Sequence, residues 1–101
     1  LRELHIFANQ ISDVSPLKEL KRLRVLNLSY NQISDVSPLK ELKQLKVLDL
    51  SYNKISDVSP LKELTRLKAL ILKDNPDLTK AQIAATQKAL PKCYISSNAK
   101  E

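Results

Sequence analysis

The residue types that most often carry catalysis or bind metals are scarce in this chain of 101 residues. His5 is the single histidine and Cys93 is the single cysteine. One cysteine cannot form an intrachain disulfide or a cysteine-based zinc cluster, and one histidine leaves few choices for a general base or a metal ligand. Glycine is absent, which excludes the glycine-rich loops that cradle phosphate groups. We therefore expect a protein that is not an enzyme and that holds no cofactor and no metal.

Two sets of polar residues recur at intervals of 22 residues. They are Asn9, Asn31, Asn53 and Asn75 in the first set, and Asp13, Asp35 and Asp57 in the second. An asparagine amide can satisfy backbone groups of the turn that it leaves, and an aspartate in a turn favours local hydrogen bonds. Calcium would need several converging oxygen ligands, which one carboxylate per interval does not provide. Both sets therefore predict a repeated structural role rather than a ligand site.

This interval reflects a repeat of the whole sequence. Residues 23–44 and 45–66 are identical at 17 of 22 positions, and residues 1–22 match residues 23–44 at 16 of 22. A fourth, partial copy covers residues 67–75 and then departs from the pattern. Each copy opens with L-x-x-L-x-L-x-x-N, in which one leucine of the first copy is replaced by isoleucine. Self-similarity at a fixed period of this length is typical of solenoid proteins.

Each repeat predicts a strand, a turn and a tight helical return. The L-x-L alternation places two apolar side chains on one face of a short strand. In the second half, ISDVSPLKEL, the apolar residues are three apart, which suits a 3₁₀ turn better than an α-helix. The proline of this segment sets the direction of the chain. No repeat can bury its own apolar edge, so the repeats must stack.

The tandem L-x-x-L-x-L-x-x-N pattern and the segment SDVSPLKEL resemble the leucine-rich repeats of internalin-like bacterial proteins. The resemblance covers residues 1–75. It implies an α/β fold, namely a right-handed solenoid with a short parallel β-sheet on its concave face and 3₁₀ segments on its convex face. We interpret the chain as the C-terminal part of such a protein.

Residues 76–95 depart from the repeat and are expected to cap the C-terminal end of the solenoid. Thr79 and Gln82 have the spacing of a capping box, in which Thr79 is the N-cap of a helix over residues 80–90. Pro91 prevents this helix from continuing. The segment ALPKC is similar to the closing helix and strand of many bacterial leucine-rich repeat proteins.

The two ends of the predicted domain differ. Residues 93–95 predict a last short strand, so we expect a single leucine-rich repeat domain over residues 1–95 and a polar tail over residues 96–101. The N-terminal end lacks the helical cap that internalin-type proteins usually carry, because the chain begins inside a repeat. The apolar residues expected at this open end are Leu1, Leu4, Ile11, Val14, Leu17 and Leu20.

The formal net charge of +6 invites an anionic partner. The basic residues recur in columns: Lys18, Lys40 and Lys62 beside Glu19, Glu41 and Glu63; Arg24, Lys46 and Lys68; and Lys21 with Lys43. No aromatic residues alternate with these lysines, as they do in proteins that bind single-stranded nucleic acids. We therefore interpret the columns as solvated faces and expect no nucleic acid partner. Uninterrupted apolar stretches are only a few residues long, so no membrane insertion is expected.

The three full repeats differ most on the predicted concave face. Repeat positions 9 and 11–20 are identical in all three, including the exposed Lys-Glu pair at positions 18 and 19, so exposure alone does not explain the contrast. A face adapted to a partner has this pattern, and so does drift after recent duplication or a consensus-designed array. The candidate partner-binding residues are His5, Phe7, Val25, Asn27, Ser29, Tyr30, Val47, Asp49, Ser51, Tyr52, Ile71, Lys73 and Asp74.

Two of these candidates, Tyr30 and Tyr52, are expected to lie side by side, with Val25 and Val47 across the same sheet. Aromatic, apolar and polar groups together are typical of protein-binding hot spots. The alternative is that the two tyrosines pack on each other and only shield the sheet.

We predict a non-catalytic module that binds a protein partner on its concave face. The alternative is a structural or self-assembling array, natural or consensus-designed, whose copies associate through the uncapped N-terminal edge, because an open sheet edge is a template for pairing. No charged and apolar leader follows Leu1, so no signal peptide is predicted. The resemblance implies a bacterial secreted or cell-surface protein but leaves the compartment open.

Overall fold

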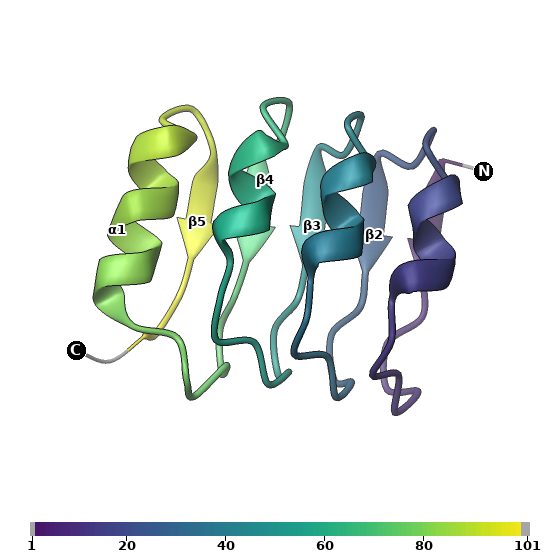
Figure 1. The fold of residues 1–101 in the computed structure, drawn as a ribbon, viewed down its shortest axis with the longest axis horizontal. Coiled ribbons are helices and arrows are strands. Elements are labelled where there is room, and N and C mark those ends of the chain that lie inside the picture. Colours follow the sequence, from purple (N-terminus) through teal and green to yellow (C-terminus); the bar gives the residue numbers. More distant parts are fainter. Residues whose placement is uncertain (1, 100–101) are drawn as a thin grey trace.

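The computed structural model describes residues 2–99. Five short strands form one parallel sheet in chain order (Figure 1). The strands are β1 (Glu3–His5), β2 (Val25–Asn27), β3 (Val47–Asp49), β4 (Ala69–Ile71) and β5 (Tyr94–Ser96). Leu26 pairs with Leu4 on one side and with Leu48 on the other, so neighbouring strands are displaced by one repeat. The strand register therefore follows the 22-residue period of the sequence.

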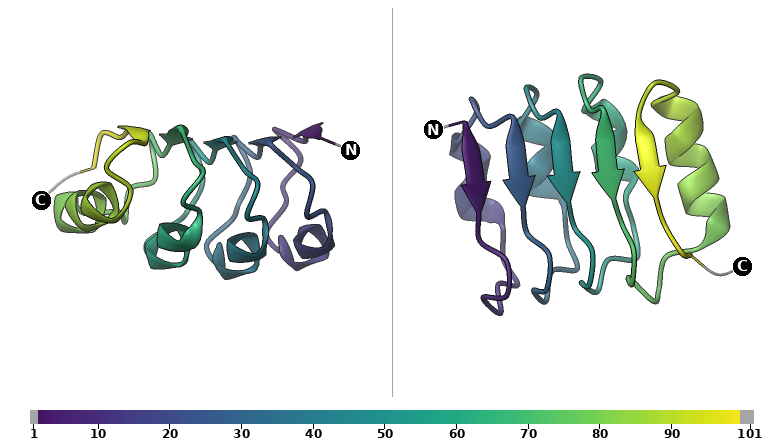
Figure 2. Two further views of the ribbon diagram at one scale, coloured as in Figure 1. Left: turned by 90° about the horizontal axis from the view of Figure 1, so that it is seen from above. Right: turned by 180° about the vertical axis from the view of Figure 1, so that it is seen from behind.

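Three 3₁₀ segments follow the first three strands. They are η1 (Ser15–Glu19), η2 (Ser37–Glu41) and η3 (Ser59–Glu63). Each has proline in its first turn, where the missing N–H costs no helical hydrogen bond. Their bonds join residues three apart, as from Leu39 N to Val36 O at 2.9 Å. Figure 2 shows the sheet as one layer and the helical segments as the other, which confirms the predicted solenoid.

The core is a continuous stack of apolar side chains between these two layers. In the third repeat seven apolar side chains are completely buried: Leu45, Leu48, Leu50, Ile55, Val58, Leu61 and Leu64. In the first repeat only Val14 is fully buried, whereas Leu4, Ile6, Ile11, Leu17 and Leu20 are partly buried. The difference arises because no repeat within residues 2–99 stacks on the outer side of the first one.

A helix covers the other end of the core, with one departure from the predicted hydrogen bonds. Helix α1 (Lys80–Ala89) begins after Thr79, whose hydroxyl accepts a bond from Gln82 N at 3.2 Å. In a complete capping box the Gln82 side chain would return to Thr79. That part of the prediction is wrong, because Gln82 Oε1 accepts a bond from Val58 N at 3.1 Å. Gln82 therefore ties the cap to the third repeat.

The last strand is one residue displaced from the predicted range 93–95, and the chain beyond it stays attached to the domain. Ser96, the first residue of the predicted polar tail, is the last residue of β5. Asp74 N donates to Asn98 Oδ1 at 2.8 Å, and Asn98 Nδ2 donates to Asp74 Oδ1 at 3.2 Å. Leu1 and residues 100–101 lie outside the described residues. Across residues 2–99, helices are too short or too polar to cross a membrane.

Candidate functional site

The recurring asparagines lie between neighbouring repeats, and their amides are occupied by backbone groups. Asn53 is 4% exposed. Its Oδ1 accepts a hydrogen bond from Ile33 N at 3.0 Å, and its Nδ2 donates to Leu28 O and Leu50 O, both at 3.0 Å. The asparagines of the second and fourth repeats make equivalent contacts. This ladder confirms the predicted structural role.

Asn9 occupies the same repeat position but is exposed. Its Nδ2 donates to Phe7 O at 2.9 Å, within its own turn. Its backbone N–H donates to Asn31 Oδ1 at 3.0 Å. Asn9 is therefore bonded by the asparagine of the second repeat, while its own amide bonds within its turn. The contrast shows that burial of the amide depends on a preceding repeat.

The recurring aspartates form the local turns that their type predicts. Asp13, Asp35 and Asp57 each accept a hydrogen bond at 2.9 Å from the backbone N–H of the serine two residues later. These bonds lower the pKa of all three carboxyls below the ordinary value of aspartate. No group of three or more His, Cys, Asp or Glu within residues 2–99 is placed to hold a metal ion.

The outward residues of the strands form rows across the sheet, which we call the sheet face. At the third repeat position Val25, Val47 and Ala69 adjoin one another in register and are half-buried. We call these three residues the apolar row. Tyr94 continues it beside Ala69 and is 68% exposed. The repeat pattern did not predict Tyr94, because β5 lies in the cap, but continuing the strand register from Ala69 would have found it.

The fifth repeat position forms a mixed row of His5, Asn27, Asp49 and Ile71. His5 is exposed, and its Nε2 lies 3.3 Å from Glu3 Oε1. The other three are half-buried. This row therefore offers a partner hydrogen-bonding groups at one end and an apolar side chain at the other.

Ser29 and Ser51 are buried, so the prediction that these side chains are available on the surface is wrong. They are 6% and 8% exposed. Ser29 Oγ donates to Asn27 Oδ1 at 2.8 Å, and Ser51 Oγ donates to Asp49 Oδ1 at 2.7 Å. The strands end at Asn27 and Asp49, so the alternation of side chains stops before the serines. Both serines stabilise the turns and are withdrawn from a partner.

Tyr30 and Tyr52 lie side by side beyond the ends of β2 and β3, as predicted. Their ring centroids are 4.2 Å apart and the ring planes differ by 10°. They are 54% and 45% exposed. Their φ angles of 58° and 57° lie in the left-handed region, which bulky residues rarely adopt, and Ala8 and Asp74 share this conformation at the same repeat position. The repeated turn therefore holds the two rings in one fixed arrangement.

Polar neighbours complete this end of the sheet face. Hydrogen bonding to Tyr30 and then to Asp74 raises the pKa of Tyr52 to about 12. Asp74 is half-buried beside Asn98, while Lys73 is exposed. Phe7 is 53% exposed in the first repeat. The structure thus brings most of the candidate residues to one surface, with Ser29 and Ser51 beneath it.

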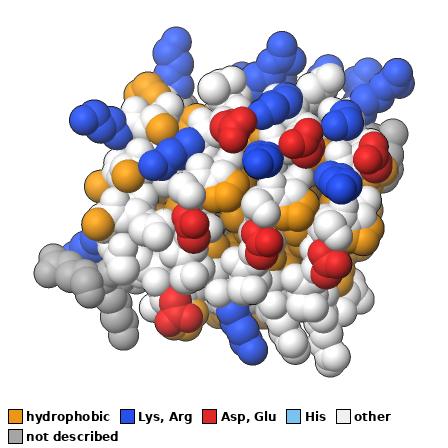
Figure 3. Space-filling view, viewed as in Figure 1, with side chains coloured by type: hydrophobic (Ala, Val, Ile, Leu, Met, Phe, Trp, Pro, Cys, Tyr) orange, Lys and Arg blue, Asp and Glu red, His pale blue; other side chains and the backbone are white. Residues whose placement is uncertain are grey.

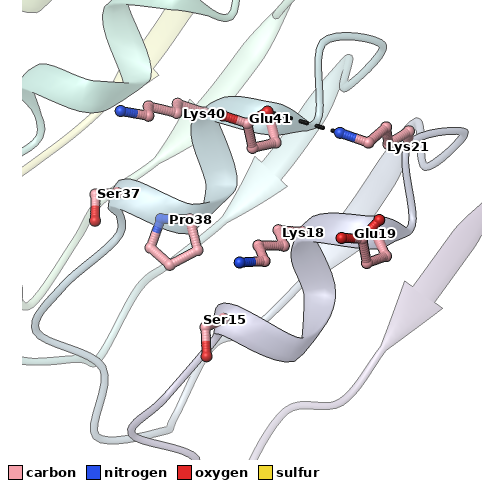
Figure 4. Close-up of a pocket in the computed structure, with 8 residues that line it drawn as sticks. All are labelled: Ser15, Lys18, Glu19, Lys21, Ser37, Pro38, Lys40 and Glu41. Atoms are coloured by element: carbon pink, nitrogen blue, oxygen red, sulfur yellow. Dashed lines mark ion pairs between the residues drawn. The ribbon is translucent and has the colours of Figure 1, made fainter.

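The opposite face, over the 3₁₀ segments, is rich in charge. Figure 3 shows basic and acidic side chains interleaved there, with apolar atoms visible in the grooves between segments. An open groove of about 430 Å³ separates η1 from η2, and lysines and glutamates line it (Figure 4). Lys21 Nζ lies 3.6 Å from Glu41 Oε1 at one end. The hydroxyls that line the groove, Ser15 and Ser37, come from turns in which aspartates bind their backbone N–H groups.

Cys93 and His5 cannot act together. Cys93 is buried before β5, and burial raises the pKa of its thiol, which disfavours the reactive thiolate. His5 lies in β1 at the other edge of the sheet. Four strand spacings separate these edges, about 19 Å in total.

Comparisons with known proteins agree with this geometry. A family model described as leucine-rich repeats (two copies) matches residues 1–41 and 43–84. An internalin (inlF) from Listeria monocytogenes is 35% identical with a TM-score of 0.90, and the match covers 100% of this chain and 30% of that one. Internalin C2 from the same species is 30% identical with a TM-score of 0.87 and coverages of 100% and 45%.

A leucine-rich repeat protein from Leptospira interrogans is 30% identical with a TM-score of 0.84, covering 95% of this chain and 25% of that one. The chain therefore spans less than half the length of these three proteins. The comparison with curated proteins gives no match. From its repeats, its fold and the family model, the chain belongs to the leucine-rich repeat family, and its repeats are of the internalin-like type.

Proposed function

We propose that this chain is a non-catalytic module that binds a protein partner on its sheet face. Leucine-rich repeat solenoids commonly use an extended sheet surface for protein binding. The observation that carries the proposal is the exposed tyrosine pair, Tyr30 and Tyr52, at one end of a sheet face that also bears the apolar row.

The tyrosine pair has the properties of an interface anchor. About half of each ring is exposed, so a partner can still bury a large aromatic area there. The stacked rings are already ordered, which lowers the entropic cost of binding. The charged side chains of Lys73 and Asp74 at the rim favour orientation and association rate more than affinity.

The size of the surface limits the affinity. The molecule measures 36 × 28 × 17 Å, and five strands span only about 20 Å. A sheet face of roughly 400 Å² is about half of what one partner buries in a standard interface. We therefore expect the chain alone to bind with a dissociation constant of about 1 μM or weaker.

The proposal includes neither catalysis nor a cofactor, and it leaves His5 and Cys93 without a catalytic role. For the compartment of the protein we follow the family resemblance, which implies a bacterial secreted or cell-surface protein. The partner is a protein whose identity the sheet face alone does not specify.

Binders selected on the immobilised chain from a random peptide library test the proposal. Their affinity is compared between the native chain, the Tyr30→Ala/Tyr52→Ala variant and the Lys18→Ala/Lys40→Ala variant, which truncates two side chains on the opposite face. We expect the tyrosine variant to bind at least about tenfold more weakly and the lysine variant to bind normally. Binders that depend on the lysines and not on the tyrosines contradict the proposal.

A second candidate function is self-association of this chain through β1, the first strand of the sheet formed by residues 2–99. Ile11, Leu17 and Leu20 remain partly exposed in the first repeat, and β1 is an edge strand of the sheet. Unpaired strand edges favour pairing with another chain. Light scattering over a hundredfold concentration range tests this candidate: a mass that rises with concentration supports it, and a constant mass near that of one chain contradicts it.

A further inference from the structure

Four basic residues adjoin one another across the sheet, just before the strands begin. They occupy the second position of each repeat and are Arg2, Arg24, Lys46 and Lys68. Each of the last three donates a backbone hydrogen bond of 2.8 Å to the residue before it in this series. Neighbouring positions are therefore about 4.8 Å apart. We call these four residues the basic row.

No acidic partner lies beside the basic row among the described residues, whereas two other lysines, Lys21 and Lys43, each have one. Lys21 lies 3.6 Å from Glu41, and Lys43 lies 3.2 Å from Glu63. No described residue forms an ion pair or a side-chain hydrogen bond with the side chains of the basic row. Like charges on neighbouring strands disfavour folding, yet the second position is basic in all four repeats. An anionic partner would remove this repulsion.

The basic row directly adjoins the apolar row. Arg24 precedes Val25, Lys46 precedes Val47, and Lys68 precedes Ala69 in the chain. At the starts of β2, β3 and β4 a strip of basic residues, of which Arg24 and Lys68 are exposed and Lys46 is half-buried, therefore adjoins an apolar strip. A surface that complements both strips places carboxylates next to apolar side chains.

We propose, on the basis of the binding function above, that the partner presents an acidic amphipathic helix to the starts of these strands. Its carboxylates contact the basic row and its apolar side chains contact the apolar row. In a helix with one acidic residue per turn, successive carboxylates lie about 5.4 Å apart along the helix axis. This distance is close to the spacing of about 4.8 Å between residues of the basic row. Over three intervals the mismatch reaches only about 2 Å, which flexible lysine and arginine side chains absorb.

The surroundings of the basic row favour such a protein segment over a nucleic acid. The exposed rings of Tyr30 and Tyr52 lie beyond the opposite ends of β2 and β3, six residues further along the chain than Arg24 and Lys46. One exposed ring, that of Tyr94, adjoins the last residue of the basic row, because Tyr94 N donates to Lys68 O at 2.8 Å. Bases of a strand bound along Arg2, Arg24 and Lys46 would not each have such a ring beside them on which to stack. The apolar row instead offers a surface that matches leucine side chains.

Titration of the ¹⁵N-labelled chain with a designed helical peptide tests this inference. The probe is an 18-residue peptide of Ala, Leu and Glu with one glutamate stripe beside one leucine stripe, and its control carries Lys in place of Glu. We expect amide shifts at residues 24–25, 46–47 and 68–69 with the acidic peptide, weakened by added salt. The lysine peptide should leave these amides unchanged.

Charge-reversal variants locate the binding energy. Arg24→Glu/Lys46→Glu should lower the affinity for the acidic peptide by roughly tenfold or more, because each exposed ion pair contributes about threefold to the affinity. Lys18→Glu/Lys40→Glu makes the same change in net charge on the opposite face and should leave affinity within about twofold. Arg24→Gln/Lys46→Gln gives a milder variant whose folding is checked by circular dichroism. Equal weakening by both reversal pairs would overturn the inference.

Two further outcomes separate this inference from the binding function. If a thymidine 12-mer binds the basic row more tightly than the acidic peptide, the choice of a protein partner is overturned. If the peptide does not bind while library binders still depend on Tyr30 and Tyr52, the inference fails and the sheet-face function stands. If neither ligand depends on the sheet face, both fail.

Discussion

Asn53→Ala removes the amide that joins the second repeat to the third. Asn53 donates to three carbonyls, those of Leu28, Leu50 and Ser51. Each keeps a second donor, because the asparagines of the adjoining repeats donate to the first two at 2.9 and 3.0 Å and Tyr30 N donates to the third at 3.0 Å. The backbone N–H of Ile33 is different, since its only hydrogen bond among the described residues is the one to Asn53 Oδ1. The substitution therefore leaves one buried donor without a partner.

The size of the effect follows from this count of hydrogen bonds. A buried donor without an acceptor costs about 1–3 kcal/mol, and Ile33 is completely buried. The shared carbonyls add little because they remain satisfied. We expect the free energy of unfolding to fall by about 2 kcal/mol, which at an m value of about 1.5 kcal/mol/M lowers the urea midpoint by more than about 1 M.

Urea unfolding followed by circular dichroism measures this loss, and Asn9→Ala is its matched control. Asn9 has the same place in the repeat but is exposed, and among the described residues its side chain bonds only Phe7 O. We expect its replacement to change the stability by less than about 0.5 kcal/mol. An unchanged midpoint for Asn53→Ala, or equal losses for both variants, would refute the argument that the ladder acts by satisfying buried backbone groups.

Three further outcomes are expected. Gln82→Ala should cost about 1 kcal/mol in urea unfolding, because Val58 N loses its acceptor; no loss would mean that this bond does not hold the cap. Absorbance at 295 nm should show Tyr52 ionising near pH 12, and Tyr30→Phe should lower that pKa; titration at an ordinary tyrosine pKa contradicts the contact. Folding lowers the pKa of Asp35, so its carboxylate should stabilise the fold above the ordinary aspartate pKa, and this stabilisation should be lost as the pH falls through the lowered pKa. An Asp35→Asn variant should therefore show a flatter dependence of the unfolding free energy on pH in acid.

The fold could be predicted because the repeat fixes the strand register. Leu26 and Leu48 pair because each is the fourth residue of its repeat. The three-residue spacing of apolar side chains with an early proline predicted η2 and its two equivalents. A solenoid of near-identical repeats contains few contacts that depend on unrelated parts of the chain.

The details that could not be predicted lie where the local pattern stops. Ser29 and Ser51 were placed on the surface because strand alternation was extended past the last paired residue, whereas side-chain hydrogen bonds hold them against Asn27 and Asp49 and both are buried. Gln82 was assigned to a local capping box, but the backbone of the third repeat competes for its side chain. Tyr94 and Asn98 follow the last repeat, so the period does not reveal that they extend the apolar row and hold Asp74.

Amide shift mapping with a library-selected binder tests the central claim most directly. If the sheet face binds protein, the binder should perturb residues 24–30, 46–52 and 68–74 of the ¹⁵N-labelled chain. Perturbations confined to the 3₁₀ segments Ser15–Glu19, Ser37–Glu41 and Ser59–Glu63 would contradict it.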